Sequence, residues 1–312
     1  MAANKPDDSA AAWMRHMRRG AFEEAWQNSD QTLRARAGKP CWHLPRHFQY
    51  IWDGASLEGK RVLVRCYHGL GDTIQFIRYA PLLKQVAAEV KVWAQPPLLP
   101  LLQTVAGIDE LLPLHDGTPD TEYDADVEIM ELPHVFRTTL HTIPAADKPY
   151  LHAAPLPLSS EKDTLAVGLV WQAGDWDERR SVPFSVLAPI AKVAGIRLYI
   201  LQAGAKAAGW QEGFGEHPGE FALHEYARVL RGLDLLITVD SMPAHLAGAL
   251  GIPVWTLLHA EADWRWMEHR DDSPWYPTMR LFRQTQPGDW ENVIREVTAE
   301  LEKLPSSLKL TV

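Results

Sequence analysis

Two short segments combine residue types that can act on a substrate hydroxyl or phosphate. The first, His68-Gly69-Leu70-Gly71-Asp72-Thr73, lies where a predicted strand ends and a predicted helix begins. Its glycines, Gly71 among them, let a ligand approach the backbone, and a helix start offers unpaired N–H groups. A carboxylate beside a hydroxyl can take its proton, so Asp72 is the first candidate for a general base and His68 the second. The structural alternative is a tight turn in which Asp72 only caps the helix.

The second segment, Thr238-Val239-Asp240-Ser241-Met242-Pro243-Ala244-His245, is again a strand that leads into a helix of small residues. The helix start can receive a diphosphate, Ser241 can donate from its hydroxyl, and His245 follows one turn later on the same face. Pro243 removes one N–H from that helix start. The alternative is capping by Asp240 and Ser241 with close helix packing. A hydrolase triad is disfavoured because the G-x-S-x-G pattern is absent.

Two further loops carry charged or aromatic side chains. Arg179 and Arg180 could clamp a phosphate through their guanidinium groups, although a solvated charged loop explains them equally well. The acidic residues just before them lack the spacing of a calcium loop, and no metal site is predicted. Asp263-Trp264-Arg265-Trp266 and the aromatic residues after it could stack on a base or sugar, or pack between domains.

The elements that must position these residues alternate between strands and helices. Residues 11–35 have the apolar spacing of two short helices, which predicts a helical hairpin. From Arg61, short β-branched runs alternate with helical segments, the pattern of a parallel α/β sheet. We expect strands at 61–67, 90–94, 110–114 and 126–130, with helices at about 74–86 and 98–105. After a proline-rich stretch the alternation resumes, with strands at 165–171, 197–202, 235–239 and 254–258 and helices at 184–193, 223–230, 244–250 and 290–304.

This pattern predicts five regions. They are an N-terminal helical hairpin and lead-in (1–58), an N-terminal α/β domain (59–150), a linker (151–164), a C-terminal α/β domain (165–288) and a C-terminal helix that could pack back over the junction (289–312). Two doubly wound domains of this kind bind ligands in a cleft at the carboxyl ends of their strands. Gln202, at such an end, and Gly71 of the first glycine turn join the residues predicted to bind a donor molecule.

Composition narrows the class of protein. With 46% hydrophobic and 23% charged residues the chain is expected to fold, and its net charge of −9 disfavours a nucleic-acid groove. Its two cysteines form no CxxC pair, which disfavours structural zinc or a disulfide scaffold. We find neither a signal-peptide pattern nor an apolar run long enough to cross a membrane, so we expect a cytoplasmic protein.

Taken together, the motifs resemble glycosyltransferase family 9, the bacterial heptosyltransferase-like enzymes, and most of all its branch associated with tetratricopeptide repeats. The resemblance covers about residues 50–300 and is carried by these stretches: Trp52-Asp53-Gly54, Gly69 to Tyr79, Val167 to Trp171, Ala244 to Gly251, and Asp263-Trp264-Arg265-Trp266 through Arg283-Gln284. It implies a GT-B-like fold of two Rossmann-like domains facing a cleft, with the acceptor on the side of domain 59–150 and the nucleotide sugar bound by domain 165–288. It also implies Asp72 as the base, Asp240, Ser241 and His245 as donor-binding residues, and Arg179 or Arg180 as the phosphate contact.

The expected function is therefore inverting, metal-independent transfer of a sugar from a nucleotide-diphosphate sugar, without a cofactor. The acceptor is expected to be a hydroxyl of a glycan, a lipid-linked molecule or a protein, and a protein partner is expected at the N-terminal helices. Two alternatives stay open at this point. One is an epimerase or hydrolase of nucleotide sugars on the same fold. The other is a catalytically silent partner that binds a nucleotide or sugar.

Overall fold

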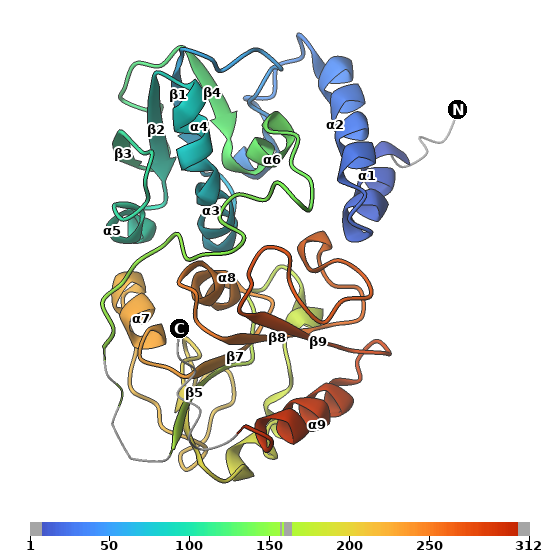
Figure 1. The fold of residues 1–312 in the computed structure, drawn as a ribbon, viewed down its shortest axis with the longest axis vertical. Helices are drawn as coiled ribbons and strands as arrows, with labels where there is room; N and C mark the ends of the chain where they lie inside the picture. Colours follow the sequence, from blue (N-terminus) through green and yellow to red (C-terminus); the bar gives the residue numbers. More distant parts are fainter. Residues whose placement is uncertain (1–7, 157, 159–163, 305–312) are drawn as a thin grey trace. The chain divides into compact units, whose positions relative to one another are not determined.

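The computed structural model describes residues 8–156, 158 and 164–304, which form two compact units (Figure 1). The first unit contains the described residues up to Ala146 together with Asp263–His269. The second contains the other described residues from Asp147 onward. Part of the predicted linker and the last eight residues lie outside the described residues. The second half of the chain thus contributes one short segment to the first unit.

The predicted N-terminal hairpin is confirmed. It consists of α1 (Asp8–Arg18) and α2 (Phe22–Arg36), which Gly20 separates with a φ of 71°. Met17, Phe22, Ala25 and Trp26 are buried, as the apolar spacing requires. The hairpin therefore packs through one apolar stripe.

The first sheet is fully parallel, with the strand order β3-β2-β1-β4. Its strands are β1 (Arg61–Arg65), β2 (Glu89–Ala94), β3 (Glu110–Pro113) and β4 (Ala125–Glu128), and its helices are α3 (Leu70–Phe76), α4 (Ala80–Val86), α5 (Leu99–Leu102) and α6 (Leu132–Val135). Strands β2 and β4 pair with opposite edges of β1. The end of β1 is therefore a switch point of the strand order, where such sheets bind ligands.

The second sheet is also parallel and has the order β6-β5-β7-β8-β9. Its strands are β5 (Leu165–Val170), β6 (Ile196–Ile200), β7 (Leu235–Val239), β8 (Val254–Leu258) and β9 (Met279–Arg283), and its helices are α7 (Leu223–Leu230), α8 (Met242–Ala249) and α9 (Trp290–Leu301). The apolar face of α9, from Trp290 to Leu301, is buried in the core of this sheet. The switch point lies between β5 and β7, because the chain leaves β5 for β6 on one side and returns to β7 on the other.

Two expectations about local structure are wrong. The predicted helix 184–193 is two separate 3-10 turns, Phe184–Val186 and Ile190–Lys192. Pro189 lies between them, and a proline removes an N–H and disfavours helical backbone in the residue before it. The strand β9 falls where no strand was expected; it is the edge strand of the sheet, with Met279, Leu281 and Phe282 buried and both arginines half-buried.

Candidate functional site

The glycine turn of the first unit is capped by Asp72 at the start of α3. Gly69 is the N-cap residue, and its N–H donates to Asp72 Oδ2 at 2.9 Å. Asp72 therefore caps the helix, as the alternative prediction for this residue stated. A carboxylate oxygen has two lone pairs, so this bond leaves the group able to accept a further hydrogen bond.

The other oxygen of Asp72 is paired with Arg265. The Arg265 guanidinium donates to Asp72 Oδ1 and also forms an ion pair with Asp263 at 2.9 Å. The side chain of Arg265 is 10% exposed and that of Asp72 24% exposed, so the pair is largely shielded from water. Two residues that are 193 positions apart therefore share one ion pair at the expected catalytic turn.

Arg265 is held in place by the segment Asp263–His269, which belongs to the first unit. Within this segment Trp264 meets the ring of Trp13 edge-on at 5.5 Å and stacks with Phe76 at 6.3 Å. The backbone N–H of Glu268 donates to the carbonyl of Arg18 at 2.8 Å. The aromatic side chains expected to stack on a ligand here are used for packing within the first unit.

His68 lies at the switch point of the first sheet, beside the end of β4. Its Nδ1 is 2.9 Å from Oε1 of Glu128, whose side chain is 2% exposed. Burial lowers the pKa of His68, but the hydrogen bond and the charge of Glu128 outweigh it, so the pKa is raised above its ordinary value. The second candidate base is therefore part of an imidazole–carboxylate pair.

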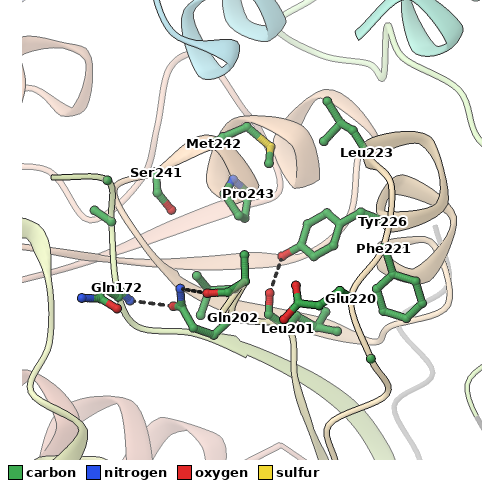
Figure 2. Close-up of a pocket in the computed structure, with 15 residues that line it drawn as sticks. Gln172, Leu201, Gln202, Glu220, Phe221, Leu223, Tyr226, Ser241, Met242 and Pro243 are labelled. Atoms are coloured by element: carbon green, nitrogen blue, oxygen red, sulfur yellow. Dashed lines mark hydrogen bonds between the residues drawn. The ribbon is translucent and has the colours of Figure 1, made fainter. Parts of the chain in front are cut away.

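The second unit holds a cavity of about 390 Å³ at the carboxyl ends of β5, β6 and β7. Figure 2 shows Ser241, Met242 and Pro243 from the start of α8 on one side, with Leu201 and Gln202 on the other. Tyr226 of α7 closes the cavity and donates from its hydroxyl to the Leu201 carbonyl at 3.2 Å. Size and position at the strand switch match those of small-molecule sites in such sheets.

Gln202 shapes the floor of this cavity. Its Oε1 accepts the N–H groups of Trp171 and Gln172 at 3.1 and 2.8 Å, and its amide nitrogen donates to the Ala203 carbonyl. Because these bonds cross from β6 to the end of β5, Gln202 fixes the two strand ends that line the cavity. Of the predicted donor-binding residues, the cavity brings together Gln202 and Ser241.

The two arginines of the 172–181 loop have different surroundings. Arg180 is buried and donates to the carbonyls of Asp240 at 3.0 Å and Gly174 at 3.2 Å, and its guanidinium lies 4.6 Å from the ring centre of Trp176. Arg179 is 60% exposed and pairs with Asp177 and Glu261. Arg180 is thus fixed beside Gly174, which lines the cavity, whereas Arg179 is in solvent.

Asp240 and His245 are buried next to the cavity without lining it. His245 Nδ1 is 3.0 Å from the hydroxyl of Tyr276, and Asp240 presents its carbonyl to Arg180. Ser241 is the N-cap residue of α8, but its hydroxyl donates to the Val239 carbonyl at 3.2 Å. Ser241 lines this cavity and His245 does not, so the two residues do not form the shared ligand-binding face that was expected.

Three residues of these sites were not foreseen as site residues: Arg265, Glu128 and Tyr226. Arg265 stood in a segment noted for its aromatic residues, but nothing in one sequence links it to Asp72. Glu128 ends a predicted strand next to the first one, so the strand-end rule that selected Gln202 would have found it. Tyr226 would have been found as the aromatic residue of the predicted helix 223–230.

The comparisons with known proteins place this fold. Residues 203–300 match the sequence model of glycosyltransferase family 9 (heptosyltransferase). The structure of the E. coli ADP-heptose LPS heptosyltransferase II is similar with a TM-score of 0.51 and 15% identity, over 77% of this chain and 97% of that one. The structure of a family 9 glycosyltransferase from Veillonella parvula has a TM-score of 0.49 and 13% identity, over 80% and 91%. The likeness to heptosyltransferase II shows a parallel α/β fold of the GT-B-like kind.

The sequence similarity is partial. The match to glycosyltransferase family 9 lies in the second half of the chain, at residues 203–300, and covers less than half of the chain. Protein FlbA of Caulobacter vibrioides is 25% identical over 335 aligned positions, which cover 92% of this chain and 54% of FlbA. The chain therefore spans about half the length of this curated relative.

The described residues also bear on membrane insertion and metal binding. None of the helices among them is both long and apolar enough to cross a membrane. Nor do the described residues contain a group of three or more His, Cys, Asp or Glu side chains arranged to hold a metal ion.

Proposed function

We propose that the protein is an inverting, metal-independent glycosyltransferase that moves a sugar from a nucleotide-diphosphate sugar to an acceptor hydroxyl. The observation that carries the proposal is the cavity at the ends of β5, β6 and β7, in the unit that contains most of the family 9 match. The acceptor is a glycan, a lipid-linked molecule or a protein, and the site of action is the cytoplasm.

The nucleotide end of the donor fits the cavity of the second unit. Phe221, Leu223, Tyr226 and Met242 give it apolar walls suited to a flat ring, within a volume of about 390 Å³. The start of α8 lies at one side, where free backbone N–H groups attract phosphate oxygens. Arg180, held beside Gly174, supplies a charge that persists at all working pH values.

The sugar transfer needs a base on the acceptor side, and Asp72 supplies it in this proposal. Asp72 takes the proton of the acceptor hydroxyl, whose oxygen attacks the anomeric carbon as the bond to the diphosphate breaks. Attack from the side opposite the leaving group inverts the anomeric centre. Arg265 and the Gly69 N–H hold the carboxylate in one orientation, which reduces the entropy lost on reaching the reactive geometry.

Binding is tested first because it needs no acceptor. We expect one class of nucleoside diphosphate or its sugar to raise the unfolding temperature of the whole chain, since a ligand of the folded state stabilises it. Substitution of Tyr226 by Ala should weaken the shift, while substitution of the exposed Phe48 by Ala should leave it unchanged. A screen in which no nucleotide stabilises the protein would overturn the donor assignment.

Transfer is tested next, with the stabilising donor and extracts fractionated into glycan, lipid and protein. We expect labelled sugar on one fraction, inverted anomeric configuration, and unchanged rates in the presence of a chelator. Consumption of the donor without acceptor would instead indicate a hydrolase or epimerase. Binding with neither outcome would support the silent partner. The contacts of both Asp72 oxygens with Gly69 and Arg265 favour this as the second candidate.

A further inference from the structure

The first unit has a second cavity, of about 430 Å³, that the transfer mechanism does not use. Its lining comes from three separate stretches of chain, residues 42–49, 65–67 and 116–123. Tyr67, which directly precedes His68, forms part of its wall. The cavity therefore adjoins the turn that carries the candidate bases.

A buried guanidinium forms the base of this cavity. Arg65, with a side chain 5% exposed, pairs with Asp126 at 2.7 Å and donates to the hydroxyls of Tyr67 and Tyr123 at 2.7 and 2.9 Å. Asp126 is opposite Leu63 in the register of the parallel strands, and Leu63 is two residues before Arg65. The side chains of Arg65 and Asp126 therefore lie on the same face of the sheet. The charge of Arg65 is offset within the protein, and the two phenol groups are held at fixed positions.

A second guanidinium, that of Arg46, stacks on two aromatic rings at this cavity. Its central carbon is 5.1 Å from the ring centre of Tyr67 and 5.2 Å from that of Trp93, and it donates to the Gly117 carbonyl at 3.1 Å. Among the described residues no carboxylate forms an ion pair with it. Stacking on two rings thus orients a positive charge that remains available to a ligand.

An exposed indole stands at the same cavity. Trp42 is 59% exposed and its ring centre is 5.5 Å from the guanidinium of Arg65. A single exposed apolar side chain is ordinary on a protein surface, but Trp42 lines a cavity together with two tyrosine rings, and such clustering is typical of ligand sites. With Tyr67 and Tyr123, Trp42 provides flat apolar faces around a polar interior that also contains Gln49 and Asp116.

The surrounding segment is basic in an acidic protein. Residues 31–52 contain four Lys and Arg residues and no Asp or Glu, whereas the whole chain has a net charge of −9. Such a local excess of positive charge attracts anions and raises their concentration near the cavity. The positive charge, the aromatic faces and the concave shape thus occur together at this cavity.

We propose that this cavity binds a sugar residue that carries a carboxylate or a phosphate. The apolar face of the sugar ring would pack on Trp42, the anionic group would meet Arg46, and hydroxyls would bond to Tyr67, Tyr123 and Asp116. A concave site of this size with several hydrogen-bonding groups suits one ring better than it suits a flat lipid surface. This inference goes beyond the proposed transfer, because it concerns binding that needs no donor.

The test is calorimetric titration of the whole chain with glucuronate, glucose 6-phosphate and glucose. We expect saturable binding of at least one of the anionic sugars and binding of glucose at least about tenfold weaker, the usual effect of losing a charged hydrogen bond. The comparison of glucuronate with glucose 6-phosphate tells whether the site prefers carboxylate or phosphate. Equal binding of glucose, or none by any of the three, would overturn the proposal.

Variants locate the binding. Arg46→Gln and Trp42→Ala should each weaken it about tenfold or more. Arg34→Gln removes the same charge from the same basic segment, and Phe48→Ala removes a ring that is 63% exposed; neither residue lines the cavity, so both variants should bind like the original protein. Equal losses in Arg34→Gln and Arg46→Gln would mean general charge attraction.

Other ligands test the chemical class. Tighter binding of adenosine monophosphate than of glucose 6-phosphate, or binding to anionic lipid vesicles alone, would contradict a sugar site. Absence of transfer activity leaves all these outcomes intact.

Discussion

Asp72 and Arg265 form an ion pair that joins the glycine turn after β1 to a segment encoded beyond β8. The pair is largely shielded from water, and Arg265 is also bound to Asp263. Removal of either partner leaves a charge without its counterpart in a poorly hydrated place. This relationship makes Arg265 a positioning residue of the proposed base.

Asp72→Asn should lower the transfer rate by about 10²- to 10⁴-fold, the usual contribution of a general base. The amide oxygen can still accept the Gly69 N–H, so the start of α3 should remain capped. Donor affinity should be unchanged because the donor cavity is lined by residues of the second unit. Rates and nucleotide affinity of the purified variant check this, and a fully active variant would reduce Asp72 to a cap and shift attention to His68.

Arg265→Gln should lower kcat more than it raises the acceptor KM, and Arg265→Lys should restore part of the loss. In a double-mutant cycle with Asp72→Asn, followed by urea unfolding, the coupling energy should be about 0.5–3 kcal/mol, the range for residues in contact. The matched control is Arg137→Gln, which breaks the ion pair between Arg137 and Asp30. The Arg137 side chain is 51% exposed, so this pair is open to water. If Arg265 couples to Asp72 no more strongly than Arg137 couples to Asp30, the pair has no positioning role.

The pKa of His68 is raised because the hydrogen bond and charge of Glu128 outweigh burial, so its protonation should stabilise the folded protein. This contribution is fully present below the unfolded pKa of about 6.5 and is lost as the pH rises through the higher folded value. His68→Gln should therefore cost stability below about pH 6.5 and progressively less above the folded pKa. Unfolding free energies at several pH values, with NMR titration of the imidazole, measure this.

His134 provides a control of opposite sign. Burial lowers its pKa despite the hydrogen bond to Asp30, so the stability linked to His134 should rise with pH up to about 6.5. His134→Gln should remove that rise. Identical pH profiles for the two variants would refute both assignments.

Arg180→Ala should weaken nucleoside-diphosphate binding about tenfold to a hundredfold, as expected for loss of a charged hydrogen bond. Arg179→Ala should change it less than about threefold, because an exposed, already paired guanidinium contributes little. Calorimetry at fixed salt compares the two variants directly. If neither change nor the double change weakens binding, the donor diphosphate must be assigned to Ser241 and the start of α8, which line the cavity.

Gly248→Ala should destabilise the second unit by about 1–3 kcal/mol. A Cβ at Gly248 would lie 2.4 Å from the ring of Tyr276, the partner of His245. Gly174→Ala is the matched control, since a Cβ there meets no atom within 4 Å. Equal unfolding midpoints for the two variants would show that helix α8 can shift without cost.

Hydrophobic periodicity predicted most strands and helices of both units because local side-chain alternation decides them. The limits of α7, β7 and β8 agree with the predicted ranges. Pro189 split the predicted helix at 184–193 through backbone sterics that periodicity ignores. Among the site residues, the strand-end rule placed Gln202 and Ser241 at a cavity, but the partners of Asp72 and His68 depend on contacts between distant segments. One sequence carries no signal for a pairing such as that of Asp72 with Arg265.

The assignment of Asp263–His269 to the first unit also has a consequence for synthesis on the ribosome. When Ala146 has been added, the nascent first unit still lacks Trp264, which later packs on Phe76, and the arginine that pairs with Asp72. Another 123 residues must be translated before His269 exists. At elongation rates of about 5–20 residues per second this delay is roughly 6–25 s. During that interval the turn that bears the proposed base exists as an unfinished, inactive intermediate, and a chain released early would retain it in that form.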